Sequence, residues 1–159
     1  GLTDTPVVLF FKELDQLYPG SKFILTIRDE KKWLRSCEEH FRYPASDKKP
    51  SGWKEEENGK FPGDFSSKLA FFRKKIYGAE TYDPNLFLKA YRGHQTAVRD
   101  FFAKRERDLL IMDISSGDGW EKLLPFLSAP VIDRPFPVKN RTTIMARVKK
   151  FFKQRLRCG

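Results

Sequence analysis

The spacing of hydrophobic residues along the chain predicts helices and strands in alternation. Two short apolar runs, at 22–27 and 109–112, are typical of buried strands because turn residues flank them and they are too short for helices. Elsewhere apolar residues recur every three or four positions, which predicts helices over 4–17, 30–41, 68–77, 83–104, 120–127 and 142–157. This order predicts an α/β fold in which the first strand is fully buried and the two strands are parallel.

Turn and capping residues mark the ends of several of these elements. Asp4-Thr5-Pro6 is a helix start, and Pro19-Gly20 is expected to stop that helix. Asp83 is followed by Pro84, another typical helix start, and Ser115 and Ser116 are expected to cap the helix at 120–127. The segment 43–67 is rich in proline, glycine and charge, and we expect a long surface loop or lid there.

The predicted sheet has only two strands, which is too few for a stable parallel sheet. We therefore expect an incomplete parallel sheet flanked by helices, in a chain that holds only part of its own fold. The expected organisation is one α/β domain over residues 1–140, incomplete at its N-terminal side, followed by a basic amphipathic helix over 141–159.

Composition supports a packed domain and excludes several classes. The 159 residues are 40% hydrophobic and 14% aromatic, far more than a disordered chain carries. The sequence has no apolar stretch long enough to cross a bilayer and no secretory signal, so we expect a cytoplasmic protein. Cys37 and Cys158 are expected to be reduced thiols, and no metal site is expected because the cysteines share no ligand spacing with His40 or His94.

The net charge of +10 is concentrated at one end of the chain. Residues 139–159 contain eight Lys or Arg and no acidic residue, whereas the rest has 23 basic and 21 acidic residues. A polyanion-binding surface over the whole domain is therefore not expected, and nucleic-acid binding is disfavoured. The amphipathic helix at 142–157 is a separate alternative, because its pattern suits a membrane surface or an acidic partner.

The strongest chemical signal lies where the first strand ends. Arg28 follows the apolar run 22–27, and Ser36 comes eight positions later on the next helix. A cation that donates two parallel hydrogen bonds, together with a hydroxyl at the carboxyl end of a strand, is a plausible phosphate-binding pair. In the alternative interpretation, Arg28 forms an ion pair with Asp29 or Glu30, and Ser36 is an incidental helix residue.

Taken in order, several segments resemble the P-loop sulfotransferase family, whose members use 3′-phosphoadenosine 5′-phosphosulfate as the sulfuryl donor. The motifs that carry the resemblance are Asp4-Thr5-Pro6, Tyr18-Pro19-Gly20 with the strand through Arg28-Asp29, Tyr91-Arg92-Gly93-His94, Asp108-Leu109-Leu110-Ile111, Gly117-Asp118-Gly119-Trp120, and Pro135-Phe136-Pro137-Val138-Lys139-Asn140. The resemblance implies a three-layer fold of the P-loop nucleotide hydrolase type.

The resemblance also implies roles for particular residues. Arg28 and Ser36 match the pair that binds the donor's 3′-phosphate, and a second basic arm would come from Lys139, Arg141 or Arg147. The alternative for this arm is a solvated basic tail. Asp4 matches the position of a general base that removes the acceptor's proton, and it is equally suited to be a simple helix N-cap.

Two further residues are weaker candidates for the site. His94 is placed on the apolar face of its helix, where a hydrogen-bonded core histidine is the commoner role, and Asp113 follows the second strand.

One expected part of the family's site is absent from these residues. Neither the motif G-x-x-x-x-G-K-[ST] nor a related Gly-Thr-Thr turn, the loop that holds the 5′-phosphosulfate in the family, occurs in the sequence. The sequence therefore predicts a sulfotransferase chain that supplies the 3′-phosphate half of a site for a hydroxyl or amine acceptor, without a metal. The alternatives are a catalytically inactive relative and the membrane or acidic-partner module.

Overall fold

The computed structural model describes residues 2, 7–41 and 65–137. The chain divides into two compact units, Gly1–Ala129 and Pro130–Gly159. In the second unit, residues 130–137 are described and contain no helix or strand. The boundary expected after residue 140 and the basic helix expected at 142–157 lie outside the described residues.

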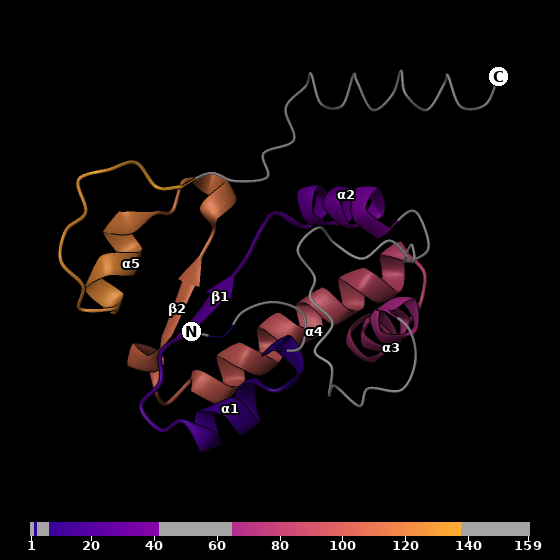
Figure 1. The fold of residues 1–159 in the computed structure, drawn as a ribbon, viewed down its shortest axis with the longest axis horizontal. Coiled ribbons are helices and arrows are strands. Elements are labelled where there is room, and N and C mark those ends of the chain that lie inside the picture. Colours follow the sequence, from indigo (N-terminus) through magenta and orange to yellow (C-terminus); the bar gives the residue numbers. More distant parts are fainter. Residues whose placement is uncertain (1, 3–6, 42–64, 138–159) are drawn as a thin grey trace. The chain divides into compact units, whose positions relative to one another are not determined.

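The first unit is a mixed α/β structure, which confirms the predicted class (Figure 1). Among the described residues its α-helices are α1 (Phe11–Leu17), α2 (Glu30–Phe41), α3 (Phe65–Tyr77), α4 (Pro84–Phe102) and α5 (Trp120–Phe126). Its strands are β1 (Phe23–Thr26) and β2 (Leu109–Met112), and its short 3-10 helices are η1 (Val7–Leu9), η2 (Glu106–Asp108) and η3 (Ile114–Ser116). Within the described residues, no helix combines the length and apolar character needed to cross a membrane. The three-layer P-loop arrangement remains a prediction.

The two strands pair in parallel and lie side by side in Figure 1. The register places Phe23 opposite Leu109 and Thr26 opposite Met112. The pairing continues one residue past β1, because the amide of Ile27 donates to the Met112 carbonyl at 2.8 Å. The prediction of a parallel pair is confirmed.

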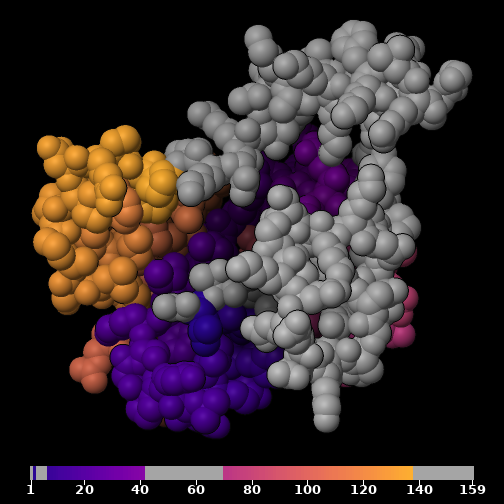
Figure 2. Space-filling model, viewed as in Figure 1, coloured from indigo at the N-terminus to yellow at the C-terminus, as the bar shows by residue number. Residues whose placement is uncertain are grey.

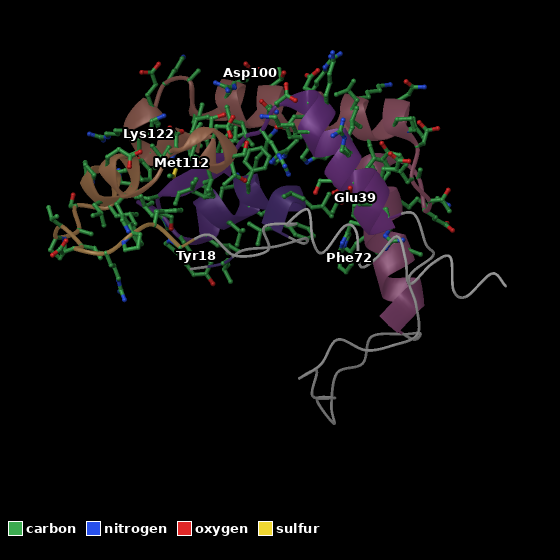
Figure 3. All side chains as sticks on the ribbon, turned by 90° about the horizontal axis from the view of Figure 1, so that it is seen from above. Tyr18, Glu39, Phe72, Asp100, Met112 and Lys122 are labelled. Carbon is green, nitrogen blue, oxygen red and sulfur yellow. The ribbon has the colours of Figure 1, made fainter. Side chains whose placement is uncertain are left out.

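The core of the sheet forms between β1 and α4. Leu25, Val98 and Phe102 make a buried cluster, and Phe102 is only 1% exposed. Partly buried apolar residues from α1, the strands and α4 pack against it: Phe11, Phe23, Ile27, Phe101, Leu109 and Ile111. In Figure 3 the β2 residue Met112, which is 2% exposed, lies among other side chains, whereas Asp100 is at the upper edge of the view.

The prediction that the first strand is fully buried is wrong for the described structure. Side chains alternate along β1, with Leu25 buried and Ile24 45% exposed. Successive side chains of a strand point to opposite faces, and the cluster on α4 covers the face that carries Phe23 and Leu25. Ile24 and Thr26 therefore remain open to solvent in the described part of the chain.

A second, aromatic cluster joins α2, α3 and α4. Phe87 of α4 is 0% exposed and stacks on Tyr77 with ring centroids 4.0 Å apart. Phe41 and Tyr82 meet the Phe87 ring edge to face, at 5.4 and 5.1 Å. Offset-stacked and edge-to-face pairs add stability beyond the burial of their area, so this cluster fixes α2 and α3 on α4.

The helix predicted over 4–17 is interrupted. It consists of η1 and then α1, with Phe10 between them in a non-helical conformation (φ −120°, ψ 18°). After α1, Gly20 adopts a φ of 80°, a value that glycine reaches without strain, so the predicted stop at Pro19-Gly20 is confirmed. Leu17, at the end of α1, is 71% exposed and the adjacent Tyr18 58%. The indigo segment that includes α1 forms part of the face shown in Figure 2.

The start of α3 and the ends of α4 also test the predicted boundaries. α3 begins at Phe65, so residues 65–67 are helical and do not belong to the predicted loop. The serines there are compatible with the first turn of a helix. The rest of that loop, 43–64, lies outside the described residues. Asp83 caps α4 as predicted, accepting hydrogen bonds from the amides of Asn85 and Leu86 at 2.9 Å. α4 ends at Phe102, two residues before the predicted end.

Replacing Phe87 with alanine tests whether the aromatic cluster holds the helices together. We expect Phe87→Ala to lower the free energy of unfolding by about 3–5 kcal/mol, because it removes a fully buried ring and leaves a cavity. Phe71→Ala is the matched control: Phe71 is 55% exposed on α3, and its loss should cost less than about 1 kcal/mol. Urea unfolding followed by circular dichroism measures both values. Equal losses in the two variants would contradict the assigned core.

Candidate functional site

The candidate site lies at the carboxyl ends of the two strands. Arg28 follows β1 and Asp113 follows β2, and the parallel register brings these ends to the same edge of the sheet. Ligands of open α/β sheets bind beyond the carboxyl ends of the strands, so this edge is where we look for a binding site.

The backbone of Arg28 is held from α4. The Tyr91 hydroxyl accepts a hydrogen bond from the Arg28 amide and donates one to the Arg28 carbonyl, both at 2.8 Å. The Tyr91 ring stacks on Trp33 of α2, with centroids 4.3 Å apart and planes 19° from parallel. One side chain of α4 thus contacts both the end of β1 and the first turn of α2.

The guanidinium of Arg28 has no competing partner in the described part of the chain. Neither Asp29 nor Glu30 pairs with it, so the ion-pair alternative for Arg28 is wrong. Asp29 instead caps α2: its Oδ1 accepts a hydrogen bond from the amide of Lys32 at 3.0 Å. Arg28 is exposed and keeps its donors available.

Glu30 is engaged by Arg92, the neighbour of Tyr91 on α4. The Arg92 Nε donates to Glu30 Oε1 at 2.8 Å, and Nη2 donates to Oε2 at 2.7 Å. The hydrogen bonds from Arg92 lower the pKa of the Glu30 carboxyl below its ordinary value. Both side chains are largely exposed, so we assign this pair to orienting α2 against α4 and not to a large gain in stability.

Ser36 lies on the exposed side of α2, next to the buried Cys37. Burial raises the pKa of the Cys37 thiol to about 11, and the positive charge of Arg28 acts in the opposite direction. Ser36 itself has the exposure that a hydroxyl ligand of phosphate requires.

Asp113, at the end of β2, is fully engaged within its own loop. Its carboxylate accepts hydrogen bonds from the Ser115 hydroxyl at 2.6 Å and from the Ser116 hydroxyl and amide at 2.8 and 3.1 Å. These bonds, led by that from Ser115, hold the pKa of Asp113 below its ordinary value. Asp113 is therefore a poor proton acceptor, and we assign it a structural role.

The predicted role of Ser115 and Ser116 as caps of α5 is wrong. Both hydroxyls serve Asp113, which caps the preceding 3-10 helix η3. α5 begins after Gly119, whose amide donates to the Glu121 carboxylate at 2.7 Å. The serines are three and more residues too early to reach the first amides of α5.

His94 lies half-buried on the face of α4 that was predicted to be apolar. Phe11 of α1 packs edge to face against its ring at 5.8 Å. Burial lowers the pKa of His94 below its ordinary value, so the neutral imidazole is favoured. His94 is thus packed against α1, and its role as a hydrogen-bonded core histidine stays a prediction.

A cavity of about 280 Å³ opens beside β1, between η1, α2, α3 and α4. Tyr91 and Trp33 are part of its wall, so the cavity adjoins the corner at which Arg28 is held. Apart from the largely neutral His94, its lining side chains carry no charge. They are Val8, Leu9, Ile24, Leu25, Thr26, Trp33, Ile76, Tyr77, Ala90, Tyr91 and His94.

Four predicted site residues lie outside the described residues. They are Asp4, the candidate base, and Lys139, Arg141 and Arg147, the candidates for the second basic arm. Among the residues that are described, no group of three or more His, Cys, Asp or Glu side chains is arranged to hold a metal ion.

The residue that sequence reasoning missed is Tyr91. The sequence placed it on the apolar face of a helix, but nothing local links it to Arg28, which lies 63 positions away. The one available signal was the Tyr91-Arg92 pair itself. Both side chains are long and end in polar groups, so from a half-buried helix face they can form hydrogen bonds with a neighbouring element.

The buried Cys37 thiol should be chemically inert in the folded chain. Thiolate is the reactive form, and with a pKa of about 11 very little is present at pH 8. We expect iodoacetamide to label Cys37 at least tenfold more slowly in the native chain than in urea, as measured by peptide mass spectrometry. The thiol ionises more readily unfolded than folded, so stability should also fall as pH rises from about 9 towards 11. Equal labelling rates in the native and unfolded chain would contradict the assigned burial.

The chain is similar to known proteins along most of its length. Residues 1–145 match the family described as the sulfotransferase domain. The Ava biosynthesis cluster protein M of Aspergillus versicolor is 26% identical over 148 residues, which cover 86% of this chain and 52% of that protein. The chain thus spans about half the length of this relative. Because the family match covers most of its residues, the chain belongs to the sulfotransferase domain family.

Proposed function

We propose that this chain binds 3′-phosphoadenosine 5′-phosphosulfate in the cytoplasm and takes part in transferring its sulfuryl group to a hydroxyl or amine of a small-molecule acceptor. The observation that best supports this proposal is the position of Arg28. Its guanidinium is exposed beyond the carboxyl end of β1, and its backbone is hydrogen-bonded to Tyr91. Membership of the sulfotransferase domain family supports the donor class.

Arg28 and Ser36 would hold the 3′-phosphate of the donor. A guanidinium donates two parallel hydrogen bonds to a phosphate, and its charge persists at every physiological pH. Ser36, exposed on α2, would add a neutral donor from the other side. Lys139 and Arg141 are our candidates for the second basic arm, and Arg147 is a further candidate.

The transfer itself exchanges one bond to sulfur for another. The acceptor oxygen or nitrogen attacks the sulfur of the donor, the bond from sulfur to the phosphate oxygen breaks, and adenosine 3′,5′-bisphosphate leaves with that electron pair. A neutral alcohol is a poor nucleophile until its proton is removed. We propose that the Asp4 carboxylate accepts this proton.

We assign no residue of this sequence to binding the 5′-phosphosulfate group of the donor. Neither G-x-x-x-x-G-K-[ST] nor a related Gly-Thr-Thr turn occurs in the sequence. Such a loop supplies backbone amides and a cation to the charge that develops during transfer. We therefore propose that the chain supplies the 3′-phosphate half of the donor site, and that the relative's additional length corresponds to the remainder.

Titration with adenosine 3′,5′-bisphosphate by calorimetry tests the donor half-site. We expect saturable binding with one site per chain. Arg28→Ala should weaken it about ten- to a hundredfold, because a hydrogen bond to a charged group contributes about 1.5–3 kcal/mol. Arg99→Ala is the matched control, because it removes the same charge from the exposed surface of α4. Its affinity should stay within about twofold. No binding by a folded chain, or equal affinities in the two variants, would overturn the proposal.

A second prediction concerns catalysis by the 159 residues alone. We expect no sulfuryl transfer above the uncatalysed rate when the chain is incubated with the donor and a panel of phenols, alcohols and amines. The reason is that removing even one donor to the developing charge costs enzymes about 10²–10³ in rate, and here the whole loop is absent. Radiolabelled sulfate transfer measures this directly. Robust turnover would show that the half-site description is incorrect.

A further inference from the structure

The hydroxyl of Tyr91 on α4 forms two hydrogen bonds with the backbone of Arg28. This single hydroxyl bonds both the amide and the carbonyl of Arg28, at 2.8 Å each, across 63 positions of sequence. A residue's amide and carbonyl lie on either side of its Cα. Holding both therefore fixes the orientation of the Arg28 peptide groups and the direction in which its side chain leaves the backbone.

The position of Arg28 explains why such an attachment matters. Ile27 makes the last hydrogen bond of the parallel ladder, to the Met112 carbonyl, and α2 begins at Glu30. Arg28 thus lies in the short connection between strand and helix, where neither ladder nor helix hydrogen bonds hold it. Without Tyr91, the Arg28 backbone has only solvent to satisfy its amide and carbonyl in the described structure.

Tyr91 is itself held from two sides. Its ring stacks on Trp33 in the first turn of α2, and the adjacent Arg92 forms a two-bond pair with Glu30 of that same turn. The position of the hydroxyl is therefore set by rigid elements. The functional side chain, Arg28, is supported by a neighbour that is itself locked by packing and hydrogen bonds.

We propose that Tyr91 is a positioning residue: its hydroxyl fixes the backbone of Arg28 so that the guanidinium is already oriented for the 3′-phosphate of the donor. This inference rests on the proposed function. Tyr91 acts through Arg28 and does not itself touch the nucleotide. Binding is strengthened because the connection between β1 and α2 is ordered before the ligand arrives.

The test is the Tyr91→Phe variant, which removes the hydroxyl and keeps the ring that stacks on Trp33. The matched control is Tyr82→Phe: the Tyr82 hydroxyl also donates to a backbone carbonyl, that of Leu34 in α2, at 3.2 Å. Both variants lose one tyrosine hydroxyl that bonds the backbone, but only Tyr91 contacts Arg28. Circular dichroism establishes that each variant is folded.

Calorimetry with adenosine 3′,5′-bisphosphate separates positioning from general stability. We expect Tyr91→Phe to weaken binding about tenfold and Tyr82→Phe to change it less than twofold. In the Arg28→Ala background, Tyr91→Phe should have no further effect on affinity, because the residue through which it acts is gone. A role confined to stability would give the same ratio in both backgrounds and would overturn the inference.

Amide hydrogen exchange provides a measurement that needs no ligand. In the wild-type chain the Arg28 amide should be protected, because it donates to Tyr91, and Tyr91→Phe should remove that protection while Tyr82→Phe leaves it intact. An unprotected Arg28 amide in the wild type would refute the attachment. Nucleotide binding that is equally tight in Tyr91→Phe and wild type would refute the positioning role and leave the proposed function standing. Absence of binding in the folded wild type would overturn both.

Discussion

The packing of α4 against β1 and α2 is the interaction on which the described structure depends. One face of this helix carries Val98 and Phe102 into the cluster under β1, and one end carries Phe87 into the aromatic cluster with α2 and α3. Between these anchors lies Tyr91, which reaches the end of β1. The residues that build the core therefore also determine where the end of the strand is held.

In this arrangement, different side chains of α4 stabilise the fold and orient the candidate site. Apolar burial supplies the stability, because the side chains of α4 that are most deeply buried are hydrocarbon. The polar contacts of Tyr91 and Arg92 contribute direction, because they act on partly exposed groups whose net contribution to stability is small. The guanidinium of Arg28 is left unpaired in the described residues because Glu30 is held by Arg92 and Asp29 caps α2.

One face of the two-stranded sheet is left partly uncovered in the described part of the chain. β1 pairs with β2 in the described structure, and Ile24 on its second face is 45% exposed. Two parallel strands rarely suffice by themselves, because parallel sheets are normally covered on both faces. The cavity beside β1 is lined by Ile24 and Thr26 of the strand and by Tyr91 of α4.

Local sequence patterns predicted the elements well wherever the determining interactions are themselves local. The bounds of α2 and β2 agree with the prediction, as does the Asp83 cap of α4, since apolar periodicity and capping act within a few residues. The same reasoning placed Arg28 at the end of a strand.

Non-local contacts account for part of what sequence reasoning did not find. The Tyr91–Arg28 and Arg92–Glu30 contacts join residues more than 60 positions apart, which no local pattern encodes. The use of Ser115 and Ser116 by Asp113 is a local contact that competes with capping of α5, and a capping pattern alone does not distinguish the two. The exposure of Ile24 was not predictable because an apolar run of this length reads the same whether one or both faces are covered.

The central claim is that the connection between β1 and α2 is a preformed phosphate site. Mapping of amide chemical shifts in the ¹⁵N-labelled chain during addition of adenosine 3′,5′-bisphosphate tests this most directly. The account predicts that the largest saturable shifts within the described residues fall between residues 27 and 37, with the exposed end of α5 unchanged. Shifts that are absent in a folded chain, or that concentrate away from this connection, would contradict it.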